Sequence, residues 1–230
     1  MYLPVVYART CIDRLAREID REIGKLGYWF DAVGPKTEDE LLAIARSLGR
    51  PLADRRDPRL AKPVSPSSSD DAPANTLSAR YGFGGFPFHS DSAHWTRPAD
   101  LLLLYCVTPG AAGRATFLQD SHTWVLPPRA RRVLRNEPWC VAGVSRPFLC
   151  THVDNAGGLR VNYDCMKPCG LTAEAKSIVA AQLDQLPKIS VQWAPASLLV
   201  LDNRRMLHAR GPATVCDADR VIIRTLVGRA

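Results

Sequence analysis

Short apolar segments separated by glycine and proline turns constrain the fold of this chain more than any other feature of its sequence. They have the length of single strands and fill most of the chain after its first third: Tyr81–Phe88, Leu101–Val107, Ala115–Leu118, Trp139–Val144, Gly158–Tyr163, Ser190–Trp193, Ser197–Leu201 and Val221–Val227. Helices do not alternate with these segments as a doubly wound parallel sheet requires. The pattern predicts a mainly β fold with flanking helices, of the sandwich or jelly-roll kind.

Helical patterns lie mostly before the strands. Apolar residues recur at helical spacing from Ile12 to Leu26, between a predicted cap at Thr10 and a predicted end at Gly27. Thr37-Glu-Asp-Glu40 has the form of a capping box, which predicts a second helix.

A further helix is predicted after Thr172, with Thr172 as its cap. Residues 61–74 are rich in Pro, Ser and Asp and are predicted to form a loop that covers the site. We expect one domain over residues 1–230, with a helical part over about residues 1–60 and a strand core over about residues 75–230.

The composition is that of an ordinary globular protein. Of the 230 residues, 46% are hydrophobic, and no apolar run approaches the roughly 18 residues that a membrane helix needs. The formal net charge is +7. A local cluster of arginines after Pro127 and Pro128 is predicted to be a solvated helix face, so no nucleic-acid partner is expected: Arg129, Arg131, Arg132 and Arg135.

The cysteines favour an intracellular protein. There are seven of them, an odd number at irregular spacing, whereas secreted disulfide frameworks more often have an even number in a shorter chain. The N-terminal segment also lacks a basic n-region and an A-x-A cleavage site. We therefore expect reduced thiols, a cytoplasmic location and no membrane partner, and the oligomeric state stays open.

The side chains best suited to bind a metal ion lie in the segment Phe86-Pro-Phe-His89-Ser-Asp91. Residues i and i+2 of an extended chain point to the same side, so His89 and Asp91 can reach one ion together. A neutral imidazole and a carboxylate suit Fe(II), and a second histidine would complete the facial triad of non-heme iron oxygenases. This triad leaves coordination positions open for a bidentate co-substrate and O2.

The second histidine must come from a distant strand, and His208 meets this requirement. The apolar segment Ser197–Leu201 enters a polar turn at Asp202-Asn203, and His208 follows where the chain re-emerges. A second H-x-D sequence, His152-Val-Asp154, leads directly into Asn-Ala-Gly-Gly, which is typical of a hairpin turn. The sequence therefore favours His89 and Asp91 over His152 and Asp154.

Four segments in order resemble the taurine dioxygenase and clavaminate synthase-like group of Fe(II)/2-oxoglutarate oxygenases: FPFHSD, PGAAGRAT, WAPASLLVLDNRRMLHARGP and DRVIIRTLV. The resemblance implies a double-stranded β-helix, a jelly-roll variant, with His89, Asp91 and His208 as the catalytic metal ligands. It also implies Fe(II), O2 and 2-oxoglutarate as co-substrate. The implied enzyme hydroxylates or desaturates an unactivated C–H bond and releases succinate and CO2. Halogenating members replace the carboxylate, so Asp91 argues against halogenation.

The resemblance assigns further residues to the co-substrate. Thr116 falls where a threonine of the group binds it, although this chain reads Ala-Gly-Arg-Ala-Thr rather than Gly-Gly-x-Thr. Arg220 and Arg224 match a pair of arginines after the distal histidine. Arg220 would clamp the distal carboxylate of 2-oxoglutarate as a planar bidentate donor. Arg224 would lie closer to the metal and meet the other carboxylate or an anionic substrate.

The expected substrate is a small, polar or anionic molecule of amino-acid or secondary metabolism. Ser92, His94 and Trp95 follow the metal motif and are candidates for contacting it, together with Arg224. His94 fits a packed or exposed histidine equally well, and Trp95 fits a pocket wall.

Two other functions remain open on the sequence. An AlkB-like demethylase of nucleic acid agrees with the positive charge, but its arginine pair is more widely spaced, and no basic segment with interleaved aromatic residues is present. A catalytically silent binding protein could keep the same fold, because a fold alone does not determine function.

Overall fold

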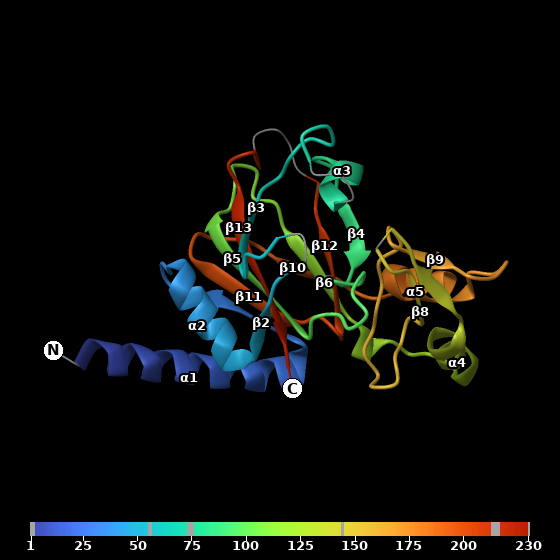
Figure 1. Ribbon diagram of the computed structural model, residues 1–230, viewed down its shortest axis with the longest axis horizontal. Helices are drawn as coiled ribbons and strands as arrows, with labels where there is room; N and C mark the ends of the chain where they lie inside the picture. The colour runs from blue at the N-terminus through green and yellow to red at the C-terminus, as the bar shows by residue number, and fades with distance from the viewer. Residues whose placement is uncertain (1–2, 55–56, 73–75, 144, 213–216, 230) are drawn as a thin grey trace.

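The structure is a computed structural model and describes residues 3–54, 57–72, 76–143, 145–212 and 217–229 (Figure 1). Two antiparallel sheets form its centre. The larger has six strands in the order β1 (Tyr28–Ala32), β11 (Ser197–Asp202), β5 (Leu101–Thr108), β13 (Val221–Gly228) and β2 (Arg50–Leu52), with β3 (Ala61–Val64) also paired to β13. The smaller has the order β10 (Ile189–Val191), β6 (Thr116–Asp120), β12 (Met206–Arg210) and β4 (Phe86–His89).

The central strands of the larger sheet are apolar at almost every position because both faces of this sheet are covered. In β5, Leu101 and Leu103 face the helices, whereas Leu102 and Cys106 face the smaller sheet. Strand β11 alternates in the same way. The period of two therefore divides one apolar run between two hydrophobic clusters.

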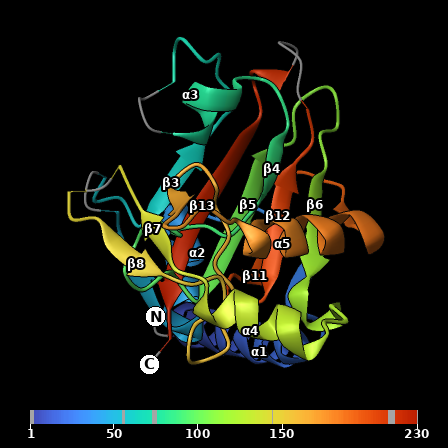
Figure 2. The same cartoon turned by 90° about the vertical axis from the view of Figure 1, so that its right-hand side faces the viewer.

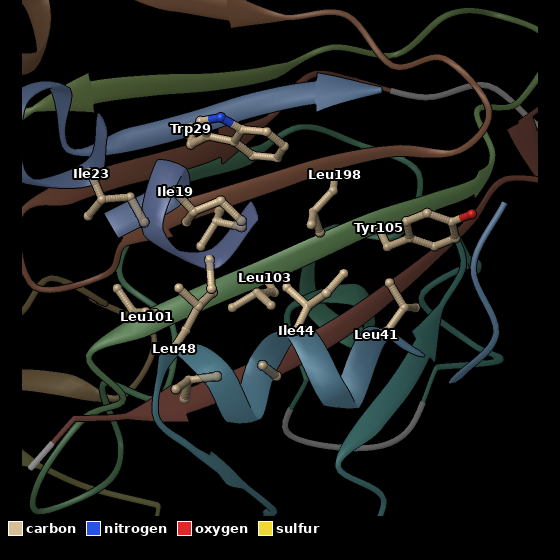
Figure 3. Close-up of a cluster of buried hydrophobic side chains, with 14 residues drawn as sticks. Ile19, Ile23, Trp29, Leu41, Ile44, Leu48, Leu101, Leu103, Tyr105 and Leu198 are labelled. Carbon is tan, nitrogen blue, oxygen red and sulfur yellow. The ribbon is translucent and has the colours of Figure 1, made fainter. Parts of the chain in front are cut away.

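Helices α1 (Leu3–Leu26) and α2 (Glu38–Leu48) cover the outer face of the larger sheet. Figure 3 shows Ile19 and Ile23 of α1 and Ile44 of α2 in one cluster with Leu103 and Leu198 of the sheet. Helix α1 begins well before the predicted cap at Thr10, and it ends as predicted before Gly27, whose φ is +79°. A capping box at Thr37 opens α2, which confirms that prediction.

A third layer lies on the other side of the smaller sheet (Figures 1 and 2). It contains α4 (Pro128–Asn136), α5 (Glu174–Gln185) and a small sheet of β8 (Phe148–Cys150), β7 (Trp139–Val141) and β9 (Met166–Pro168). Leu207 of β12 packs with Trp139, Met166 and Val179 in the cluster beneath this layer. The described residues also include two short helices, α3 (Leu77–Tyr81) and η1 (Ser121–Thr123).

Three predicted segments differ from the structure. Tyr81 ends α3 rather than beginning a strand, because Thr76 caps a short helix and Gly82, at φ +50°, turns the chain towards Phe86. Residues 61–64 of the predicted loop are strand β3. Residues 158–163 form only an isolated bridge, since their backbone groups bond to separate partners such as the carbonyls of Arg204 and His152. A covering role for residues 61–74 stays a prediction, and residues 73–74 lie outside the described part.

No helix in the described ranges is both long enough and apolar enough to cross a membrane. Six cysteines lie in these ranges, and each is a free thiol.

Candidate metal centre

His89, Asp91 and His208 converge between the two sheets. His89 ends β4 and pairs directly with His208 of β12 in the antiparallel register, and Asp91 follows His89 by two residues. One ligand atom of each residue lies within 4.8 Å of the other two, and among the described residues no other group of three metal-ligating side chains does so. Nε2 of His89 and Nε2 of His208 lie 3.5 and 3.7 Å from Oδ1 of Asp91.

The His89 ring is oriented by its own strand. Its Nδ1 lies 2.9 Å from the carbonyl oxygen of Pro87, which can only accept a hydrogen bond. Nδ1 therefore carries the proton, and Nε2 presents its lone pair to the centre. A backbone carbonyl commonly fixes the tautomer of a metal-binding histidine in this way.

The electrostatics favour the protonation states that bind a cation. Burial lowers the pKa of His208, and the neighbouring His89 lowers it further. Burial alone would favour a protonated Asp91, but the positive charge of Arg224 beside it holds the pKa of Asp91 well below its usual range. A neutral imidazole and an ionised carboxylate are the forms that ligate a metal.

The Asp91 backbone is held by Asn203, a residue that is 1% exposed. Its Oδ1 accepts from the backbone N–H of Asp91 at 2.8 Å, and its Nδ2 donates to the carbonyls of Asp91 (3.0 Å) and Ala99 (2.8 Å). The sequence placed Asn203 in a turn but did not reveal this role. An asparagine directly after a buried strand was the available signal.

Arg160 holds the loop that follows Asp91, a role that no sequence pattern predicted. Its Nη1 donates to the carbonyls of Ala93 (2.8 Å) and Trp95 (2.7 Å), and its Nη2 donates to the carbonyl of Thr96 (2.9 Å). Because Arg160 is buried and comes from a distant segment, it fixes where the loop lies beside the centre.

Ser92 lies in this loop with a φ of +53°. Its hydroxyl donates to the carbonyl of Asp91 and accepts from the N–H of Ala99, and both hydrogen bonds are 2.7 Å long. His94 lies 3.4 Å from a carboxylate oxygen of Asp54, and Trp95 packs against the cluster between the sheets. Substrate contact by Ser92, His94 or Trp95 stays a prediction.

Thr116 and Arg220 lie close to the same indole. Trp193 Nε1 donates to Thr116 Oγ1 at 3.0 Å, which leaves the threonine proton available for another acceptor. The guanidinium carbon of Arg220 lies 5.8 Å from the centre of a Trp193 ring. Arg220 is buried, and burial lowers its pKa. Arg224, further along β13, donates from Nη1 to Oδ2 of Asp91 at 3.2 Å.

The second H-x-D has structural contacts instead. His152 is 0% exposed. Its Nε2 lies 3.1 Å from the hydroxyl oxygen of Tyr163, and its ring packs edge-on against the Trp139 ring. Burial lowers the pKa of His152 to about 4. Asp154 pairs with Arg204 and caps its own turn by accepting from the N–H of Gly158.

Comparisons with known proteins support the fold. No protein-family model matches the chain, and no curated protein matches it by sequence. The solved structure of the non-heme iron oxygenase OrfP, in complex with Fe and alpha-ketoglutaric acid, matches with a TM-score of 0.74 at 18% identity, covering 95% of this chain and 80% of that chain. Asparagine oxygenase, in complex with Fe(II), 2S,3S-3-hydroxyasparagine and succinate, matches with a TM-score of 0.73 at 19% identity, covering 95% and 79%.

These similarities establish the fold. The chain has the mainly β jelly roll of the non-heme iron oxygenases, with flanking helices, which confirms the fold that the sequence predicted.

Proposed function

We propose that this protein is an Fe(II)- and 2-oxoglutarate-dependent oxygenase that hydroxylates or desaturates a C–H bond of a small polar molecule and releases succinate and CO2. The observation that carries the proposal is the convergence of His89, Asp91 and His208 within 4.8 Å of one another. The shared fold with OrfP and asparagine oxygenase adds independent support.

The residues of the site fit Fe(II) as the resident metal. Two imidazoles and one carboxylate are the donor set of the facial triad, and the Pro87 carbonyl keeps Nε2 of His89 free to ligate. Bound Fe(II) would supply the activation of O2 and the oxidation of the substrate.

The other residues of the site would stabilise the charge of Asp91 and orient the co-substrate. Arg224 keeps Asp91 ionised and fixes one of its oxygens, which leaves the other oxygen for the metal. Arg220 and Thr116 would bind the distal carboxylate of 2-oxoglutarate, with Trp193 as a wall of that pocket. These contacts would orient the keto acid and shelter it from water.

An amino acid or a close derivative is the substrate class that we propose. A structure of OrfP contains succinate and (3R,4R)-dihydroxy-L-Arg, and the asparagine oxygenase structure contains a hydroxyasparagine. The positive charge of Arg224 beside the centre suits an anionic group such as an α-carboxylate.

The test is succinate release from 2-oxoglutarate with a panel of free amino acids and their derivatives. At least one should stimulate release by the wild type, His208→Ala should abolish it, and the exposed-site control His122→Ala should retain it. Equal release by the wild type and His208→Ala would contradict the metal assignment. Stimulation only by a methylated oligonucleotide would support a nucleic-acid demethylase instead.

A further inference from the structure

Three arginines gather at the end of the site beyond Thr116. Arg114 precedes β6, Arg220 precedes β13, and Arg210 ends β12 directly opposite Thr116 in the register. Arg210 follows His208 by two residues on the same strand, so both side chains leave β12 on one face. Nη1 of Arg220 donates to the backbone carbonyl of Arg114 at 2.7 Å, which ties the two segments together.

Arg114 has unused hydrogen-bond donors in a buried place. The residue is 3% exposed, and its Nη2 donates to the carbonyl of Phe83 at 3.2 Å. Nε and Nη1 are buried and have no partner among the described residues. A buried guanidinium with open donors is costly unless an anion or another acceptor satisfies it.

Positive charge exceeds negative charge around Arg114. Among the described residues, Asp217 is the acidic group whose charge acts on both Arg114 and Arg220. Burial and the charge of Arg220 together lower the pKa of Arg114 to about 10. The surroundings therefore favour a further negative charge at this end of the site.

Arg210 differs from Arg114 because its contacts are structural. Its Nη2 donates to the carbonyls of Gly82 (2.6 Å) and Gly84 (2.7 Å), and its guanidinium lies over the Phe86 ring at 3.3 Å. Arg210 thus fixes the turn between α3 and β4. Arg114 touches the same turn through one nitrogen and keeps two others open.

We propose that Arg114 is a second arginine for the distal carboxylate of 2-oxoglutarate, acting beside Arg220 and Thr116. The inference rests on the proposed function. A carboxylate has two oxygens and about four acceptor positions, so it accommodates donors from both guanidinium groups and the threonine hydroxyl. Arg114 is also the residue that makes the turn before Thr116 depart from Gly-Gly-x-Thr.

The test compares two keto acids that differ only at the far end. Binding to the Fe(II)-loaded protein under argon is measured for 2-oxoglutarate and for 2-oxopentanoate, which has a methyl group in place of the distal carboxylate. Arg114→Gln should weaken 2-oxoglutarate roughly ten- to a hundredfold, the loss expected for one charge-assisted partner, and leave 2-oxopentanoate unchanged. Arg129→Gln, an exposed arginine of α4, should change neither.

The two keto acids also separate the possible failures. A wild type that binds neither contradicts the proposed function itself. Normal binding of 2-oxoglutarate by Arg114→Gln, or an equal loss for both keto acids, overturns only the role of Arg114. If Arg114→Gln does not fold, Arg114→Lys carries the same comparison: a larger loss for 2-oxoglutarate supports the proposal, and equal losses overturn it.

Discussion

Asn203 shows how a single buried side chain can determine the geometry of this site. It bonds both the N–H and the carbonyl of Asp91 and also the carbonyl of Ala99, so its amide bridges both ends of the loop after β4. Without it, the N–H of Asp91 and the carbonyl of Ala99 would lose these partners in a buried place, whereas the carbonyl of Asp91 would keep the Ser92 hydroxyl. We therefore treat Asn203 as a positioning residue for Asp91, the carboxylate that we propose as a metal ligand.

Asn203→Ala should lower the free energy of unfolding by about 2–4 kcal/mol, because it leaves buried polar groups unpaired. It should also weaken Fe(II) binding roughly ten- to a hundredfold, as loss of a supporting residue commonly does. Urea unfolding and anaerobic iron titration measure these effects. Asn136→Ala, at the exposed end of α4, is the control, and unchanged iron affinity in Asn203→Ala would refute the positioning role.

His152 gives the protein a predictable dependence on pH. Burial lowers its pKa to about 4, so the folded state stays unprotonated at pH 5, whereas the unfolded chain binds a proton near pH 6.5. Because the unfolded state then binds more protons, stability falls as the pH falls. From pH 7 to pH 5, His152 should cost about 2 kcal/mol.

Urea unfolding at pH 7 and pH 5 measures this contribution. His152→Phe should reduce the loss of stability between the two pH values by about 2 kcal/mol, whereas the exposed His122→Ala should not reduce it. An identical loss in His152→Phe and the wild type would show that His152 is protonated in the folded protein.

At the scale of elements, strands were easier to predict than helix ends. The apolar runs around Leu103 and Val200 required burial on both faces, and the structure places them at the centre of the larger sheet. Local sequence also determined the capping box at Thr37. The segment 158–163 was misjudged because its backbone partners come from several distant segments, which no local pattern records.

The start of α5 shows the same limit. The sequence predicted a cap at Thr172, but the N-cap position is Ala173, which has no capping side chain, and Glu137 of another segment bonds the first N–H groups of the helix instead. Its carboxylate accepts from the N–H groups of Glu174 (3.0 Å) and Ala175 (2.8 Å). Burial opposes ionisation, but hydrogen bonds from Trp139 and from these N–H groups hold the pKa of Glu137 below its usual value.

Glu137→Gln should lower the free energy of unfolding by about 1–2 kcal/mol, because it removes a negative charge from the N-terminus of α5. Thr172→Ala should cost less, because Thr172 only reaches Glu137 at 3.4 Å. Denaturant unfolding of both variants measures the difference. A larger loss in Thr172→Ala would mean that the threonine is the effective cap.

At the scale of the whole molecule, the site forms where two sheets meet. The smaller sheet supplies His89 and His208, and the larger sheet supplies Arg224, which contacts Asp91 between them. The convergence of His89, Asp91 and His208 could be predicted because the H-x-D spacing and the distal histidine are sequence patterns. Asn203, Arg160 and Arg114 could not, because their roles depend on which distant backbone groups they meet.

The most direct test of the account is anaerobic titration of the purified protein with Fe(II), followed by 2-oxoglutarate. We expect one Fe(II) per chain and, after addition of the keto acid, the weak visible absorption of a chelated keto acid, with both lost in His208→Ala and kept in His122→Ala. A wild type that binds no iron, or a His208→Ala variant that gives the same absorption, would contradict the central claim that these three side chains form the metal centre.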